Sequence, residues 1–229
     1  MNLLKRPGGE LANRPLHFIW IVDCSGSMFR EKIGVVNHAI AEVIPVMRKE
    51  AEENPSARVL VRALKFADGA SWITSVPEEL EKYEWAPLEA DGVTSMGKAF
   101  ELLAAQLTIP PMPERALPPV LVLLSDGAPT DDYKEPLRKL KELPWGKKAV
   151  KIAVSIGKDA DDDMLCEFTG NMEYVLQANN ATRLKELIKW VSTVVKAVSQ
   201  PKTNQEAEGA APLVLNAPPP DDSTEGDVW

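Results

Sequence analysis

Residues 16–27 read LHFIWIVDCSGS, and this stretch decides the fold. The part at 16–22 is almost continuously apolar, which is typical of a strand buried on both faces of a sheet. The run ends in a polar turn that contains Gly26. Apolar residues at helical spacing follow at 31–50, so the segment predicts a buried strand, a polar loop and then a helix. Pro45 lies inside that helix and is expected to kink it or to end it early.

The same alternation of strand and helix continues along the chain and predicts an α/β fold. Strands are expected at 57–66, 71–76, 120–124, 149–156 and 173–176, and helices at 95–107, 133–143, 161–168 and 182–198. Asp68-Gly69 has the composition of a two-residue hairpin turn. We therefore predict a Rossmann-like, three-layer, doubly wound and mostly parallel sheet with one antiparallel edge strand.

The 229 residues suit one domain of moderate size. We expect it to span 15–199, with an N-terminal extension at 1–14 and a disordered, proline-rich acidic tail at 200–229. The net charge of −8 argues against nucleic acid or an anionic membrane as a partner. No apolar run is long enough to cross a bilayer, which favours a cytoplasmic protein. Cys24 and Cys166 are then expected to be free thiols, with a disulfide between them left open.

Three polar clusters lie where predicted strands end or a predicted helix begins, at 23–27, 91–95 and 125–127. Because ligands of open α/β sheets bind beyond the carboxyl ends of the strands, we expect the clusters to form one site. Hard oxygen donors suit Mg²⁺, Mn²⁺ or Ca²⁺, and few, short ligands favour Mg²⁺. The candidate ligands are Asp23, Ser25, Ser27, Thr94 and Asp126.

The order of these motifs resembles the metal-ion-dependent adhesion site of von Willebrand factor A (VWA) domains. Strand-Asp-x-Ser-x-Ser stands at 21–27, a threonine in a glycine-flanked loop at 91–97, and strand-Ser-Asp-Gly at 123–127. The resemblance covers residues 15–198 and implies a VWA fold. It implies that the three hydroxyl groups bind the metal directly and that the two carboxylates act mostly through water. An Asp or Glu of a protein partner would complete the coordination shell. Cys24 stands where Thr, Ser or another small residue is more usual and is expected to point away from the metal.

The third motif continues as Pro129-Thr130-Asp131-Asp132, which is most similar to bacterial proteins of the TerY type, named for tellurite resistance. That similarity implies a protein-binding role in bacterial stress response or defence, with kinase-like or phosphatase-like partners. Asp131 and Asp132 themselves are interpreted as helix N-terminal acids. A further candidate for the partner carboxylate is the chain's own tail, which carries Asp221, Asp222, Glu225 and Asp227.

Two other functions stay open. A phosphohydrolase would use Asp23 as a nucleophile, but such enzymes want a second Asp two residues on, where this chain has Ser25. In a metal-free scaffold, Asp23 and Ser27 would be helix caps and Asp126-Gly127 an ordinary turn. The two histidines have no catalytic companions and are expected to be structural.

Overall fold

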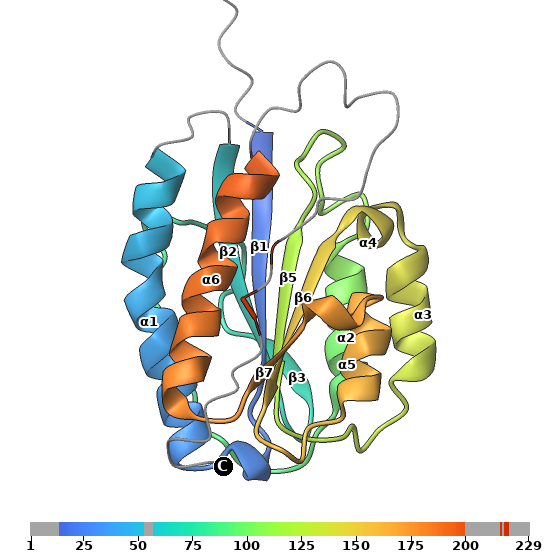
Figure 1. Ribbon diagram of the computed structural model, residues 1–229. Coiled ribbons are helices and arrows are strands. Elements are labelled where there is room, and N and C mark those ends of the chain that lie inside the picture. The colour runs from blue at the N-terminus through green and yellow to red at the C-terminus, as the bar shows by residue number, and fades with distance from the viewer. Residues whose placement is uncertain (1–13, 53–56, 200–215, 217, 220–229) are drawn as a thin grey trace, which may run out of the picture.

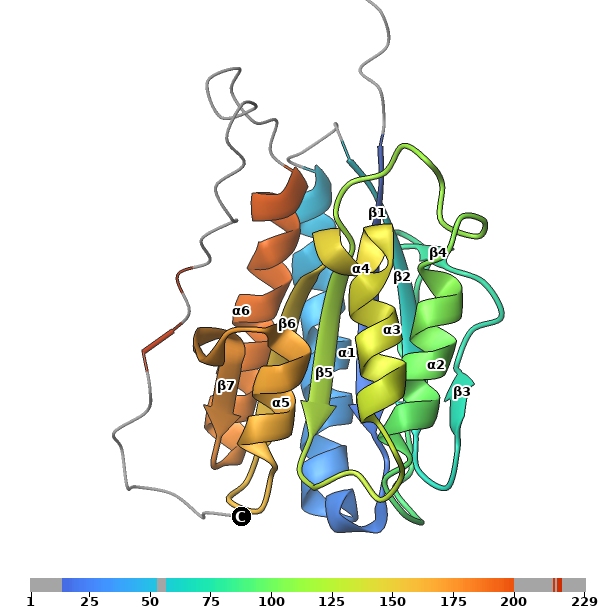
Figure 2. The ribbon, with the colours of Figure 1, turned by 90° about the vertical axis from the view of Figure 1, so that its right-hand side faces the viewer.

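A mixed sheet forms the centre of the protein, and helices cover both of its faces (Figures 1 and 2). The computed structural model describes residues 14–52, 57–199, 216, 218 and 219. The path through the sheet is β3-β2-β1-β5-β6-β7, and β4 pairs with β2. The strands are β1 (Arg14–Asp23), β2 (Ala57–Phe66), β3 (Ala70–Trp72), β4 (Glu78–Glu79), β5 (Val120–Ser125), β6 (Val150–Ile156) and β7 (Val175–Ala178).

The helices form the two outer layers. One face carries α1 (Glu31–Glu52) and α6 (Ala181–Ser199), which pack against each other. The opposite face carries α2 (Met96–Gln106), α3 (Lys134–Glu142), α4 (Pro144–Lys148) and α5 (Asp162–Thr169). Two 3-10 turns, η1 (Gly26–Met28) and η2 (Met172–Tyr174), precede α1 and β7. β3 and β4 pair antiparallel with β2, and the other strand pairs are parallel. The predicted three-layer fold with an antiparallel edge is confirmed.

Strand β1 divides its side chains between two hydrophobic cores. Phe18, Trp20 and Val22 pack with residues of α1 and α6, whereas Ile19 and Ile21 pack with residues of α2 and α5. None of these five side chains is more than 1% exposed. Alternate residues of a strand point to opposite faces of the sheet, so a strand between two helical layers has to be apolar throughout. This requirement explains the continuous apolar run at 16–22.

The antiparallel edge is held in place by a buried arginine. β3 folds back on β2 after Asp68-Gly69, as the hairpin signature predicts. The guanidinium of Arg62 on β2 lies 3.9 Å from the ring centroid of Trp72 and donates a 2.6 Å hydrogen bond to Oε1 of Gln106 on α2. These contacts join β2, β3 and α2, and the hairpin between β2 and β3 then supports one of the loops of the candidate site.

Several boundaries differ from those expected. The predicted strand at 71–76 is shorter in the structure: β3 ends at Trp72, and the N–H of Ile73 makes one more hydrogen bond to Ala63 of β2. The next residues that pair with β2 as a strand are those of β4. The first helix continues through Pro45 to Glu52. Pro45 and position 41, whose carbonyl loses its helical N–H partner, are both exposed, so the helix tolerates the proline on its solvent-facing side. α4 has no counterpart among the predicted elements, because a five-residue helix is too short to show hydrophobic periodicity.

The predicted N-terminal extension at 1–14 and tail at 200–229 lie outside the described residues, apart from Arg14, Asn216, Pro218 and Pro219. Within the described part of the chain, no helix has the length and apolar character needed to cross a membrane. Both cysteines are free, as predicted.

Candidate metal centre

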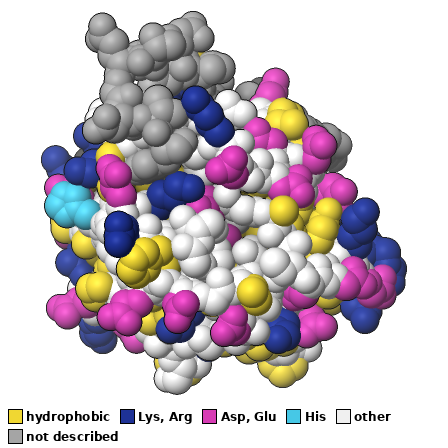
Figure 3. All heavy atoms as spheres, turned by 90° about the horizontal axis from the view of Figure 1, so that it is seen from below, with side chains coloured by type: hydrophobic (Ala, Val, Ile, Leu, Met, Phe, Trp, Pro, Cys, Tyr) yellow, Lys and Arg dark blue, Asp and Glu magenta, His cyan; other side chains and the backbone are white. Residues whose placement is uncertain are grey.

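The carboxyl ends of β1 and β5 lie next to each other at one edge of the sheet. The two strands are parallel neighbours, with Val22 opposite Leu124, so the chain leaves both strands at the same point. Three loops meet at this edge: a first loop at 23–30, a second at 91–95 and a third at 125–132. Figure 3 views this end of the molecule, where charged side chains surround an area of backbone and uncharged polar side chains. The structure thus brings the three polar clusters of the sequence to one edge of the sheet.

The first and second loops are joined through their backbones. The N–H of Asp91 donates to the carbonyl of Cys24 (2.8 Å), and the N–H of Gly26 donates to the carbonyl of Gly92 (2.9 Å). Gly92 has a positive φ of 86°, and a Cβ there would lie 2.3 Å from Oδ1 of Asp68. The same Asp68 oxygen accepts a 2.9 Å hydrogen bond from the next backbone N–H. Glycine is therefore required at 92 both for its conformation and for the close approach of Asp68.

The backbone of Thr94 is hydrogen-bonded to Thr130 of the third loop. Its carbonyl accepts from the N–H of Thr130 (2.9 Å), and its N–H donates to Oγ1 of Thr130 (3.2 Å). A Cβ built on Gly127 would lie 3.9 Å from Oγ1 of Thr94 and 3.6 Å from Oγ of Ser27. The two hydroxyls thus approach the same glycine from different loops.

Asp23 is the buried anchor of the first loop. Its Oδ1 accepts a 2.8 Å hydrogen bond from the N–H of Ser25, and its Oδ2 accepts a 2.6 Å hydrogen bond from the hydroxyl of Ser125. Burial raises the pKa of Asp23 above its usual range; hydrogen bonds from Ser125 and Ser25 oppose that shift, and the charge of Asp126 adds to it. A buried carboxylate that meets a second carboxylate in this way is stabilised by a nearby cation.

A chain of polar contacts links Ser25 to the start of α1. The hydroxyls of Ser25 and Ser27 lie 3.0 Å apart, and Ser27 donates to Oδ1 of Asp126 at 2.7 Å. Oδ2 of Asp126 accepts a 2.7 Å hydrogen bond from the ammonium group of Lys32. Asp126 is 1% exposed, so its charge is neutralised almost entirely by protein groups. Hydrogen bonds thus connect four of the five predicted ligands, namely Asp23, Ser25, Ser27 and Asp126. The Thr94 hydroxyl lies near Gly127, the residue after Asp126.

These residues fit a hard divalent cation. They supply three hydroxyl and two carboxylate oxygens, the ligand type that Mg²⁺, Mn²⁺ and Ca²⁺ prefer. A cation, the Lys32 ammonium, already sits against one carboxylate. Among the described residues, no group of three or more His, Cys, Asp or Glu side chains is arranged to hold a metal.

Cys24 does not belong to the ligand set. Its side chain packs into the core between the sheet, α1 and α6 and is 2% exposed. Burial, together with the nearby charge of Asp23, raises the pKa of the Cys24 thiol to about 12. A thiol in that state is a poor metal ligand, because metals bind the thiolate. The expectation that Cys24 points away from the site is confirmed.

Asp131 caps a helix, but not the one that follows it. Its Oδ1 accepts from the N–H of Gly97 (2.9 Å) and its Oδ2 from the N–H of Lys98 (3.2 Å), both in the first turn of α2. Asp132 accepts from the N–H of Lys134 at the start of α3, as predicted for a helix N-terminal acid. Asp131 therefore ties the third loop to the helix that begins directly after Thr94.

Replacing Asp131 by Ala is expected to lower the free energy of unfolding by about 1–2 kcal/mol, because two N–H groups of α2 lose their acceptor and the helix dipole loses a favourable charge. Urea unfolding followed by circular dichroism measures this. Asp132→Ala is the matched control, since its carboxylate accepts only one longer hydrogen bond of 3.2 Å, and its effect should be smaller. An unchanged unfolding midpoint for Asp131→Ala would contradict the capping role.

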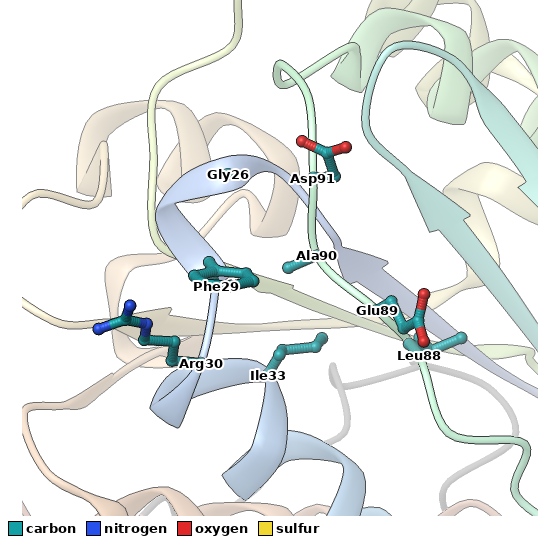
Figure 4. A pocket seen from close by; sticks show the side chains of 8 residues that line it. All are labelled: Gly26, Phe29, Arg30, Ile33, Leu88, Glu89, Ala90 and Asp91. Carbon is teal, nitrogen blue, oxygen red and sulfur yellow. The ribbon is translucent and has the colours of Figure 1, made fainter.

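A groove with a volume of about 740 Å³ opens beside the first and second loops (Figure 4). Phe29, Arg30 and Ile33 line one side, and the segment 88–91 lines the other. Phe29 is 61% exposed, and Val93 in the second loop is 49% exposed. Two large apolar side chains are thus presented to solvent within two residues of the hydroxyls of Ser27 and Thr94.

Three contributors to the site were not among the predicted ligands. Ser125 fixes Asp23, Asp68 fixes the second loop, and Lys32 neutralises Asp126. Ser125 was visible as part of the third motif. Lys32 carries no motif and Asp68 carries only that of a hairpin turn, so only the fold brings these two residues to this edge.

Comparison with known proteins places the domain in a family. Residues 19–190 match the family model described as von Willebrand factor type A domain. This match covers most of the chain, and the protein belongs to the VWA family. No curated protein sequence matches the chain significantly.

Solved structures share the fold at low sequence identity. Proximal thread matrix protein 1 from the mussel byssus, with a zinc-occupied metal-ion-dependent adhesion site (MIDAS) motif, aligns with a TM-score of 0.58 at 17% identity over 81% of this chain and 46% of its own. An ArnB paralog from Sulfolobus acidocaldarius aligns with a TM-score of 0.54 at 18% identity over 76% and 44%. The pilus adhesin SpaC from Lactobacillus rhamnosus GG, in its open conformation, aligns with a TM-score of 0.63 at 13% identity over 80% of this chain and 30% of its own. The chain thus spans less than half the length of each of these proteins.

Proposed function

We propose that this VWA domain is a non-enzymatic, metal-dependent protein-binding module. The proposed ion is Mg²⁺, with Mn²⁺ and Ca²⁺ as alternatives. One observation carries the proposal: three loops bring hydroxyls and two buried carboxylates to one point beyond the strand ends. The proposed ligands are Asp23, Ser25, Ser27, Thr94 and Asp126.

The composition of the site supports an incomplete coordination shell. Only two side chains in it carry negative charge, and Lys32 offsets one of them. A divalent cation bound there would keep much of its positive charge and would attract an anionic oxygen. An Asp or Glu of a partner protein supplies that oxygen in our proposal, and apolar residues beside it would contact Phe29. The zinc-occupied MIDAS motif of the mussel byssus protein, which shares the fold, supports metal binding in our proposal.

The contacts of Asp23 argue against the alternative of a phosphohydrolase. Both of its carboxylate oxygens accept hydrogen bonds at 2.8 Å or less, and the residue is 0% exposed. A nucleophilic carboxylate needs an oxygen that is free to attack a substrate. We therefore assign Asp23 to positioning the first loop and balancing the metal charge.

The biological setting follows from the extended third motif. Its similarity to TerY-type proteins favours a cytoplasmic role in bacterial stress response, including tellurite resistance, or in defence. Kinase-like or phosphatase-like proteins are the proposed partners. Nucleic acid and membrane are not proposed as partners, given the net charge of −8.

The tail of the same chain is a second proposed source of the carboxylate. The indole N–H of Trp190 donates to the carbonyl of Asn216 (3.0 Å), and the guanidinium of Arg183 donates to the carbonyl of Pro219. Trp190 lies in the middle of α6 and Arg183 in its first turn, so Asn216 contacts the middle of the helix and Pro219 contacts its start. That first turn lies at the same end of the molecule as the metal site (Figure 1). Ten residues follow Pro219, which is enough chain to span about 30 Å.

Capture of partners with and without metal tests the proposal. The immobilised full chain should retain a partner in Mg²⁺ and release it on addition of a chelator, and Ser27→Ala should not retain it. A chain ending at Pro219 should capture more partner if the tail competes for the metal. Retention that is unaffected by chelator and by Ser27→Ala would overturn the function, and magnesium-dependent phosphatase activity lost in Asp23→Ala would favour the enzyme.

A further inference from the structure

Lys32 forms an ion pair inside the candidate metal centre. It is the second residue of α1, and its ammonium nitrogen lies 2.7 Å from Oδ2 of Asp126. The side chain of Asp126 is 0% exposed and that of Lys32 is 15% exposed. The surface pair of Arg138 and Glu135 has side chains that are 56% and 47% exposed. Because water screens such surface pairs and is largely absent here, the Lys32–Asp126 pair interacts much more strongly.

Both oxygens of Asp126 are engaged when this pair is formed. Oδ1 accepts from the hydroxyl of Ser27 and Oδ2 accepts from Lys32. A cation that is coordinated by Asp126, directly or through water, has to compete with one of these donors. Lys32 is the donor that carries charge, so it also repels an approaching divalent cation.

We propose that Lys32 sets the metal affinity of this site by competing with the divalent cation for Asp126. This inference rests on the proposed function and assigns a regulator to the same site. The ammonium group keeps Asp126 neutralised while the site is empty, which avoids a buried, unpaired carboxylate. The same group makes metal binding weaker than the five oxygen ligands alone would give.

The charge left on the metal is the functional consequence. If Lys32 holds one oxygen of Asp126, the cation is balanced by less negative charge from the protein. It then attracts the carboxylate of a partner more strongly. Lys32 thereby weakens the binding of the metal alone and makes it depend on the carboxylate of a partner. Metal and partner then stabilise each other's binding.

Replacement of Lys32 by Met tests this inference, because Met keeps the length of the side chain and removes the charge. Calorimetric titration with Mg²⁺ and with Mn²⁺ should give an affinity at least about tenfold tighter than that of the native chain. Lys32→Arg should stay close to native. Lys49→Met, an exposed lysine on the same helix, removes the same charge elsewhere and should leave the affinity unchanged.

Thermal unfolding gives a second readout that does not depend on partner binding. Without metal, Lys32→Met should melt below the native chain because Asp126 loses its counter-ion, and saturating Mg²⁺ should remove most of that difference. Equal or weaker metal affinity in Lys32→Met, while the native chain binds metal, would overturn the inference alone. Absence of saturable binding in both chains would overturn the proposed function and the inference together. If Lys32→Met binds metal and the native chain does not, the inference is supported, and metal-dependent partner binding by the native chain is contradicted.

Discussion

Replacement of Asp126 by Ala is expected to abolish divalent cation binding in the concentration range where the native chain is saturated, with a loss of affinity of about a hundredfold or more. Three effects act in the same direction. The site loses one of its two carboxylates, and the hydroxyl of Ser27 loses the acceptor that orients it at 2.7 Å. Lys32 then remains in the site without the partner that neutralises it, and it repels the cation.

Titration calorimetry with Mg²⁺ and Mn²⁺ measures this loss, and circular dichroism confirms that the variant is folded. Asp132→Ala is the matched control, because it removes the same charge from an exposed position on the same loop. The double variant with Lys32→Met should regain part of the affinity, since the unpaired ammonium is removed. Native affinity in Asp126→Ala would show that the cation, if bound, lies elsewhere.

The arrangement of the polypeptide follows from the sequence more fully than the site does. The apolar run at 16–22 and its polar turn specify a buried strand with ligands at its end, because such a strand has no exposed face on which to place them. The site residues Asp23 and Asp126 follow by the same logic, as each stands at the end of a central strand. Local patterns of apolar and polar residues are therefore enough to predict the strands and the residues that end them.

Contacts between distant segments could not be predicted in this way. Helical periodicity identifies Ile33 and Val36 as buried and leaves Lys32 on a polar face, with nothing to indicate that its ammonium reaches a residue 94 positions later. Asp131 was expected to serve its own helix, yet it caps α2, 34 residues earlier in the chain. β4 has only two residues, both acidic, and pairs through its backbone, which hydrophobic patterns do not report.

The free energy of unfolding should fall by about 3 kcal/mol as the pH is lowered from 6.5 to 4 because of one residue, His17. This histidine lies on β1 and is 4% exposed. Burial, together with the charge of Arg62, lowers the pKa of His17 from 6.5 to about 4. Between these two values the unfolded chain binds a proton that the folded protein does not bind. Acidification therefore favours the unfolded state in this range, and the loss levels off below pH 4, where folded His17 is protonated as well.

Urea unfolding at a series of pH values, with chelator present, measures the effect as the difference between the native chain and His17→Gln. Comparing the two chains is necessary because Asp23 changes the free energy of unfolding with pH in the opposite direction. Its pKa is raised in the folded protein, so acidification stabilises the folded state through Asp23. That contribution is present in both chains and cancels. His38→Gln removes an exposed histidine, 57% exposed and paired with Glu42, and its profile should run parallel to the native one. If His17→Gln loses stability with falling pH as steeply as the native chain does, a group other than His17 governs the acid sensitivity of this fold.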